Sequence, residues 1–157
     1  MRRMRGPVVA LLIGMAARLA GANGAPQSAP YDPTRDPALD LANAREEARR
    51  EEKRVLLQVG GNWCGWCREF DRFVHADAAV AEALRCAFVV VHVNVSPENG
   101  NARFLSAYPG VPGYPYLIVL DADGRVLATV DTDDFLNGEA YDRGKFLKFA
   151  RKFSAAP

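Results

Sequence analysis

The sequence predicts an α/β fold in which helices sandwich a mixed sheet, with one helix ahead of the first strand. Two apolar runs, 55–59 and 88–94, have the length and β-branched composition of buried strands. Segments with helical spacing of apolar residues lie before, between and after these runs. Strands that alternate with helices and close on a hairpin and a final helix are typical of such a mixed sheet.

Three helices are expected around the first strand. The first runs from residue 36 or 40 to about 53, with small apolar residues on one side and charges elsewhere. The second follows the turn residues 60–62 and continues to about residue 74, and the third covers 77–84. The apolar stripe of the second helix consists of Trp66, Phe70, Phe73 and Val74.

The second half of the chain predicts a strand at 88–94, a loop and a short helix at 102–107. Two strand-like runs, 116–120 and 125–130, flank the turn Asp121-Ala-Asp-Gly124 and predict a hairpin. The last helix carries an apolar stripe formed by Phe146, Phe149, Ala150 and Phe153.

The ends of the chain predict an exported protein. Residues 1–24 combine an arginine-rich start, an apolar run at 8–17 and small residues typical of a cleavage site, which together indicate a signal peptide. Residues 25–37 are rich in proline and predict an extended lead-in, and 38–155 are expected to form one domain. We therefore expect a periplasmic or otherwise extracytoplasmic location.

The charge balance argues against nucleic acid and anionic membrane surfaces as partners. Four of the 20 basic residues lie within the predicted signal peptide, which leaves 16 basic against 19 acidic residues in the remainder. A net charge of about −3 on that part has no basic excess to attract phosphates.

Trp63-Cys64-Gly65-Trp66-Cys67 lies between the first strand and the second helix and carries the predicted chemistry. Cys64 is expected at the start of the helix, where free backbone N–H groups and the helix dipole favour a thiolate. Cys67 is one turn further on the same side, within disulfide reach. The pattern predicts a redox-active pair.

Two other interpretations of this pair remain open. A zinc site needs a second ligand pair, and the remaining candidates, Cys86, His75 and His92, are scattered. The second alternative is a purely structural disulfide, although a loop this short would add little to the stability of a whole domain. We expect no metal and no cofactor. Cys86 precedes a buried strand, so we expect a buried, inert side chain, with an exposed exchange-active thiol as the alternative.

Together with Gly113-Tyr114-Pro115-Tyr116 at the head of a later strand, this motif resembles the thioredoxin superfamily over about residues 36–153. The resemblance implies a thioredoxin fold and a cis Pro115 that faces the disulfide, whereas Pro112 is expected to be trans. A proline at this place offers no N–H, so neighbouring backbone groups can pair with an extended substrate.

The chain departs from thioredoxins at Gln58, where they carry a buried aspartate six residues before the first cysteine. The run Cys67-Arg-Glu-Phe-Asp71 is similar instead to the C-terminal domain of the periplasmic thiol:disulfide interchange protein. That likeness implies proton transfer by Asp71 as one interpretation and a solvated helix residue as the other.

The aromatic residues around the motifs indicate a surface for an extended polypeptide. We expect substrate binding by Trp63, Trp66, Tyr114 and Pro115. The resulting hypothesis is a thiol–disulfide oxidoreductase acting on exported, disulfide-bearing proteins, in the reducing or interchange direction. It implies a membrane or periplasmic redox partner, and we expect a monomer. The competing hypothesis is a redox-inactive binding module of the same fold.

Overall fold

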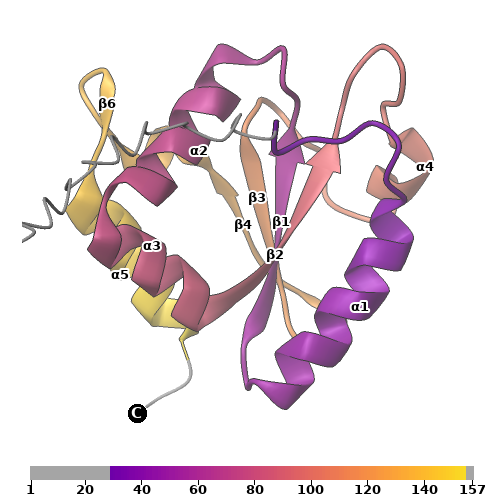
Figure 1. Ribbon diagram of the computed structural model, residues 1–157, viewed down its shortest axis with the longest axis horizontal. Coiled ribbons are helices and arrows are strands. Elements are labelled where there is room, and N and C mark those ends of the chain that lie inside the picture. Colours follow the sequence, from indigo (N-terminus) through magenta and orange to yellow (C-terminus); the bar gives the residue numbers. More distant parts are fainter. Residues whose placement is uncertain (1–28, 155–157) are drawn as a thin grey trace, which may run out of the picture.

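The computed structural model describes residues 29–154. Its centre is a four-stranded sheet with helices on both faces (Figure 1). The predicted signal peptide at 1–24 and the first residues of the lead-in lie outside the described part. The strands are β1 (Arg54–Gly60), β2 (Phe88–Asn94), β3 (Tyr116–Leu120) and β4 (Val126–Asp131).

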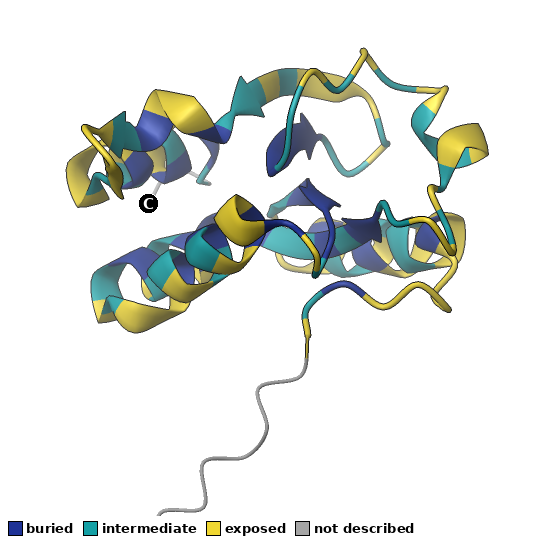
Figure 2. Cartoon of the chain, turned by 90° about the horizontal axis from the view of Figure 1, so that it is seen from above, coloured by how far each residue is buried: buried dark blue, intermediate teal, exposed yellow. Residues whose placement is uncertain are grey.

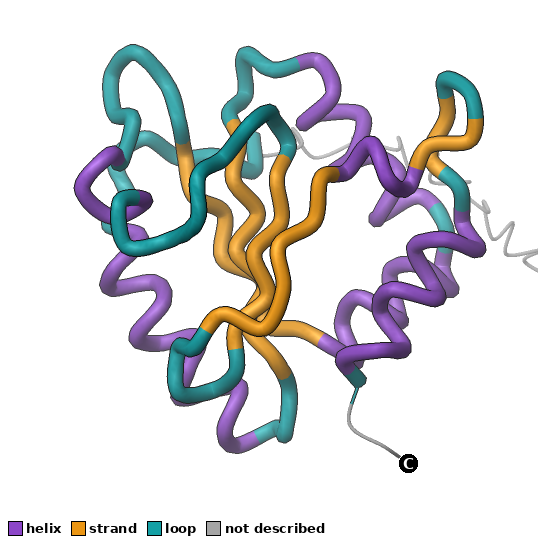
Figure 3. The backbone as a smooth tube through the Cα atoms, turned by 180° about the vertical axis from the view of Figure 1, so that it is seen from behind, coloured by secondary structure: helices purple, strands orange, loops and turns teal. Residues whose placement is uncertain are grey.

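The strand order is β2-β1-β3-β4, which confirms the predicted mixed sheet. β1 pairs in parallel with β2, with Gln58 opposite His92, and antiparallel with β3, with Gln58 opposite Leu117. β3 and β4 form the predicted antiparallel hairpin. Figure 3 shows the four strands side by side, with helices on either side of them.

One face of the sheet is covered by α1 (Pro37–Arg50). Asp36 caps this helix by accepting a hydrogen bond of 2.8 Å from the Ala38 N–H, and a proline at the first helical position suits its fixed φ. Ala44 and Ala48 are buried against alternate residues of β1, and their small side chains let the helix approach the sheet. The helix therefore shields one side of β1, whereas Gln58 belongs to the other.

Three helices cover the opposite face. Their buried residues pack with Leu56 of β1 into an aromatic-rich core, in which Phe70 and Phe146 are fully buried. Figure 2 shows the buried strand residues between helices whose outer surfaces are exposed. The helices are α2 (Gly65–Ala76), α3 (Ala78–Ala87) and α5 (Arg143–Phe153).

Two short elements differ from the expectation. The predicted helix at 102–107 is confirmed as α4 but ends earlier (Ala102–Leu105). Between β4 and α5 lie a 3-10 turn and a small hairpin that the sequence did not predict, because each is only a few residues long. They are η1 (Thr132–Phe135), β5 (Leu136–Asn137) and β6 (Ala140–Tyr141). No helix within residues 29–154 is long and apolar enough to cross a membrane.

Candidate active site

Cys64 and Cys67 form a disulfide at the start of α2. Cys64 is the N-cap residue: its backbone is extended, and its sulfur accepts a 3.1 Å hydrogen bond from the Cys67 N–H. The Cα atoms are 5.2 Å apart, within the range that a disulfide spans. Cys64 is 7% exposed and Cys67 is 0% exposed, so only Cys64 can be reached from solvent.

The turn between β1 and α2 holds Cys64 in place. The Val95 N–H donates to the Gly60 carbonyl at 2.7 Å, and the Cys64 N–H donates to the Gly61 carbonyl at 3.1 Å. A Cβ on Gly61 would lie 2.6 Å from the Val95 carbonyl oxygen, so this close approach requires glycine. The turn brings the carboxyl end of a buried strand directly into a helix N-terminus.

The head of β3 faces the disulfide. The Tyr114–Pro115 peptide bond is cis, as predicted, and Pro112 is not cis. Cys64 Sγ lies 3.7 Å from the Tyr114 carbonyl oxygen. The Thr132 hydroxyl, fully buried, donates to the Pro115 carbonyl at 2.9 Å. Sequence reasoning missed Thr132, because nothing near it in the chain indicates what it bonds.

Exposed aromatic rings flank the cysteines. Trp63 is 57% exposed and meets Tyr114 edge to face at 5.9 Å between ring centroids, while its Nε1–H donates to the Val95 carbonyl at 2.6 Å. Trp66 is 44% exposed and meets Tyr141 edge to face at 6.0 Å. Trp66 was predicted in the apolar stripe of this helix, but its ring is exposed and accessible to a ligand.

Asp71 lies one turn after Cys67 on α2 and is partly exposed. Its Oδ1 atom is 3.6 Å from His75 Nδ1, and the two side chains line an open cavity of about 770 Å³ together with His92. Burial lowers the pKa of His92. Asp71 is therefore placed beside the site, and its predicted role in proton transfer stays a prediction.

Tyr31, in the predicted lead-in, is an unexpected member of the site. Its side chain is 1% exposed and clusters with both cysteines. Its backbone N–H donates to Asn62 Oδ1 at 3.2 Å, and Asn62 Nδ2 donates back to its carbonyl at 2.5 Å. The lead-in is thus fastened to the active-site turn, and it crosses the end of the sheet where β1 and β2 finish (Figure 1).

The Tyr31 hydroxyl reaches into the sheet. It accepts a 3.0 Å hydrogen bond from Gln58 Nε2, and its ring meets that of His92 edge to face at 5.3 Å. Burial raises the pKa of Tyr31 far above its usual value, so the hydroxyl stays protonated. A tyrosine in a polar, proline-rich stretch gives no periodic signal, which is why its burial was not predicted.

A family model described as thioredoxin-like matches residues 36–122, more than half of the chain. The chain belongs to the thioredoxin-like family. The thiol:disulfide interchange protein DsbD of Actinobacillus pleuropneumoniae serotype 5b is 27% identical to this thioredoxin-like chain over 89 residues, and DsbD of Escherichia coli K12 is 26% identical. The match spans 57% of this chain but only 15% and 16% of those relatives.

Solved structures share the thioredoxin fold predicted here. A disulphide isomerase from Xylella fastidiosa Temecula1 superposes with a TM-score of 0.69 and 26% identity, over 81% of this chain and 98% of that one. The oxidised C-terminal domain of Neisseria meningitidis DsbD superposes with a TM-score of 0.54 and 23% identity, over 75% of this chain and 96% of that domain. The second likeness concerns the fold alone.

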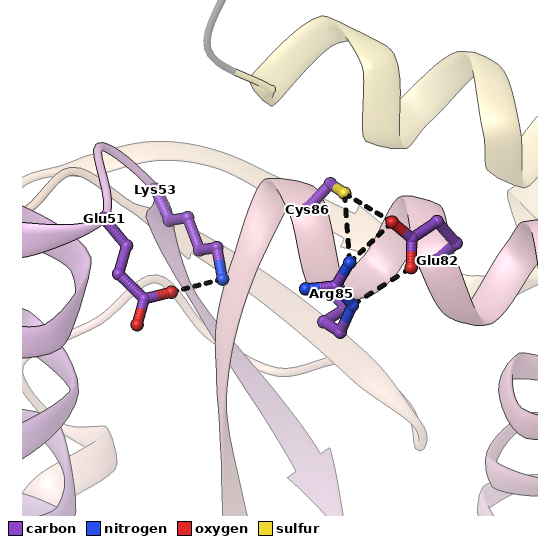
Figure 4. Close-up of polar contacts among 5 residues, drawn as sticks. All are labelled: Glu51, Lys53, Glu82, Arg85 and Cys86. Atoms are coloured by element: carbon purple, nitrogen blue, oxygen red, sulfur yellow. Dashed lines mark hydrogen bonds and ion pairs between the residues drawn. The ribbon is translucent and has the colours of Figure 1, made fainter.

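Cys86 corrects a prediction, because it is exposed and not buried in this thioredoxin-like chain. The buried stripe of α3 is Val80, Leu84 and Ala87, and the preceding position points outward. Its thiol donates to Glu82 Oε1 at 3.2 Å, and Arg85 Nη2 lies 3.9 Å from the sulfur (Figure 4). The bond to Glu82 raises the pKa of Cys86, so the thiol is protonated at neutral pH.

Metal ligands are not grouped in the part of the chain that the structure describes. No three histidine, cysteine, aspartate or glutamate side chains between residues 29 and 154 are placed to share an ion. Cys67 is bonded to Cys64, and Cys86 lies on the outer surface of α3. The zinc interpretation of the pair therefore receives no support from the arrangement of these residues.

Proposed function

We propose that this protein is a thiol–disulfide oxidoreductase that uses Cys64 as the nucleophile and Cys67 as the resolving thiol. The observation that carries the proposal is the asymmetry of the pair: Cys64 caps a helix and keeps 7% of its surface exposed, whereas Cys67 is fully buried. The likeness to DsbD and to a disulphide isomerase supports the same chemistry.

In the reducing direction the Cys64 thiolate attacks one sulfur of a substrate disulfide. A mixed disulfide forms, and the other substrate sulfur leaves as a thiolate that takes a proton from solvent. The Cys67 thiolate then attacks Cys64 Sγ, which forms the Cys64–Cys67 bond and releases the second substrate sulfur. The substrate gains two electrons, and the protein is left oxidised. The N–H of Cys67 already points at Cys64 Sγ and stabilises negative charge there.

Substrate binding is proposed at the surface formed by Trp63, Trp66, Tyr114 and Pro115. Trp63 and Tyr114 touch edge to face beside the disulfide, and both tryptophan rings are open to solvent. Apolar rings of this kind suit an extended polypeptide, because they bind side chains of many shapes. The substrates would be disulfide-bearing proteins.

The direction is proposed to be reduction or interchange. The residue before Cys67 is Trp66, which adds no positive charge to stabilise the Cys64 thiolate further. A less stabilised thiolate makes the disulfide a weaker oxidant, so we expect a potential nearer to about −270 mV than to about −120 mV. Equilibration with glutathione measures this potential, and a value above about −150 mV would contradict the assignment.

The setting is proposed from the sequence: export by residues 1–24, a domain over 38–155, and an extracytoplasmic location. An exported reductant requires an electron donor, so we infer a membrane or periplasmic redox partner. Nucleic acid is not expected as a partner, and the protein is expected to act as a monomer without a bound metal or cofactor.

Trapping and turnover test the proposal together. Reduced Cys67→Ser protein should accumulate mixed disulfides with protein substrates through Cys64, whereas Cys64→Ser should form none and should not accelerate insulin reduction by dithiothreitol. Cys86→Ser is the matched control and should behave as the unaltered protein. The absence of adducts together with no acceleration of insulin reduction would rule the activity out.

A redox-inactive binding module is the second candidate. It is favoured by one observation, the two exposed tryptophans beside a closed disulfide. Such a module would bind unfolded polypeptide equally well in the Cys64→Ser variant and would leave the rate of insulin reduction unchanged. The rate of insulin reduction therefore distinguishes the two candidates, because only the oxidoreductase accelerates it.

A further inference from the structure

The buried sulfur of Cys67 presents a problem for the proposed reaction. Cys67 must be a thiolate when it attacks Cys64, yet it is 0% exposed, and burial in apolar surroundings raises the pKa of a thiol. Gln58, the side chain that points to this side of β1, carries no charge and cannot take up a proton at neutral pH. A hydrogen-bond donor next to Cys67 Sγ would stabilise the thiolate and lower its pKa.

The Tyr31 hydroxyl stands next to that sulfur across Gly60. A Cβ built on Gly60 would lie 2.7 Å from Cys67 Sγ and 2.7 Å from Tyr31 Oη, so the two atoms are at most twice that distance apart. Gly60 has an ordinary backbone conformation, and because it lacks a side chain the sulfur and the hydroxyl can both pack against it.

The hydrogen bonds of the hydroxyl leave its hydrogen available. Gln58 Nε2 donates to Tyr31 Oη at 3.0 Å, and an amide NH₂ group cannot accept a bond in return. Among residues 29–154 the hydroxyl makes no other hydrogen bond, to oxygen, nitrogen or sulfur, while the disulfide is closed. Its hydrogen can therefore turn toward Cys67 Sγ once the disulfide opens.

We propose that Tyr31 is a positioning residue for Cys67, donating a hydrogen bond from its hydroxyl to the Cys67 thiolate during resolution of the mixed disulfide. The proposal rests on the proposed function. Tyr31 keeps its own proton: the Cys67 proton passes to water that enters while Cys64 is bonded to the substrate, the Cys64–Cys67 bond forms as the Cys64–substrate bond breaks, and the departing substrate thiolate takes up a proton in turn.

The surroundings hold the tyrosine in place for this role. Asn62, in the turn before α2, makes two hydrogen bonds to the backbone of Tyr31, and the His92 ring on β2 packs edge to face against the Tyr31 ring. The titratable groups facing it are Asp71 on α2, His92 on β2 and Tyr141 on β6, with Tyr114 beside the cysteines. All four are retained when Tyr31 is changed to phenylalanine, so that substitution isolates the hydroxyl.

The test measures the acid dissociation constant of Cys67 directly. In a Cys64→Ser, Cys86→Ser background Cys67 is the sole cysteine, and the chemical shift of its labelled Cβ follows its ionisation with pH. Adding Tyr31→Phe should lower the acid dissociation constant of Cys67 about tenfold or more, which is a higher pKa, because the thiolate loses a hydrogen bond. Tyr108→Phe, a half-buried tyrosine on the far side of the sheet, is the matched control and should change it less than twofold.

Turnover supplies the second readout. In the otherwise unaltered chain, Tyr31→Phe should move the pH at which mixed-disulfide resolution reaches half its maximal rate upward by about one unit. The rate at which iodoacetamide alkylates Cys64 in the reduced protein should stay within twofold. Gly60→Ala places a methyl group too close to both atoms, so it must displace the hydroxyl or the sulfur, and it should shift the pH profile in the same direction.

An unchanged Cys67 dissociation constant in a folded Tyr31→Phe protein would overturn the proposal. If the unaltered protein fails to reduce insulin while Tyr31→Phe still lowers that constant, the proposed function fails and the hydrogen bond stands. If Tyr31→Phe does not fold, a Gly60→Ala protein with unchanged Cys67 ionisation would overturn the proposal.

Discussion

Cys64 Sγ lies 3.7 Å from the carbonyl oxygen of Tyr114, although 50 positions separate the two residues. The contact exists because β3 pairs with β1 and so begins beside the turn that carries Cys64. The backbone just before Pro115 is thereby presented to any chain that reaches the sulfur.

Thr132→Val should loosen the segment around Pro115. The substitution keeps the shape of the side chain but removes the hydroxyl that donates to the Pro115 carbonyl, so the free energy of unfolding should fall by about 1 kcal/mol. We also expect a higher KM for insulin. Chemical denaturation and steady-state kinetics measure the two effects. Thr129→Val, on the exposed edge strand, is the control, and equal effects in both variants would contradict the assignment.

Trp63→Ala and Trp66→Ala should weaken substrate binding without altering the chemistry of Cys64. Each removes an exposed ring from the proposed binding surface, so we expect KM for a protein substrate to rise several-fold, in line with about 1 kcal/mol per lost aromatic contact. The alkylation rate of Cys64 should not change. Leu127→Ala removes an equally exposed apolar side chain on β4 and should leave KM as it was.

Cys86 should react slowly with iodoacetamide at neutral pH in spite of its exposure. Its pKa is raised, chiefly by the bond to Glu82, so little thiolate is present. Glu82→Gln removes the negative charge and should accelerate alkylation, as followed by mass spectrometry. Glu69→Gln on α2 serves as the control. Rapid modification of the unaltered protein would show that Glu82 does not suppress the thiolate.

His92 should make the folded state less stable in mild acid. Burial lowers the pKa of His92 in the folded protein, so below about pH 6.5 the unfolded chain takes up the proton first. Its favourable contribution is complete above that pH and is lost as the pH falls toward the folded pKa. Denaturation at pH 7.5 and pH 5.5 should show a larger drop for the unaltered protein than for His92→Phe. His75→Gln, at an exposed position, should reduce that drop much less, because burial contributes more to the lowered pKa of His92 than the charge of His75 does.

Most helices and strands of this structure could be predicted from short stretches of the sequence. The strand at 88–94 is found with the predicted bounds, and β1 and α2 differ from the prediction by one or two residues at their ends. Periodicity and caps involve neighbours in the chain, so they can be read without knowing the fold. The place of Cys64 at a helix start follows from the same local signals.

The burial of single residues could not be read in this way. Cys86 was expected inside because a buried strand follows it, yet the rotation of α3 directs it outward. Tyr31 was expected in an open lead-in, yet it lies between β1, β2 and the cysteines. Both outcomes depend on which surfaces meet, and that information is spread over segments far apart in the chain.

The sequence by itself thus determined the cysteine pair and the helix start that holds it, because each is carried by a contiguous motif, and the resemblance to the thioredoxin superfamily added the proline that faces them. Only the tertiary structure decided what surrounds Cys67. A side chain from 29 positions upstream, Tyr31, packs with the Cys67 sulfur against Gly60. A buried sulfur takes its chemistry from the atoms packed against it, and packing partners are chosen by the whole fold.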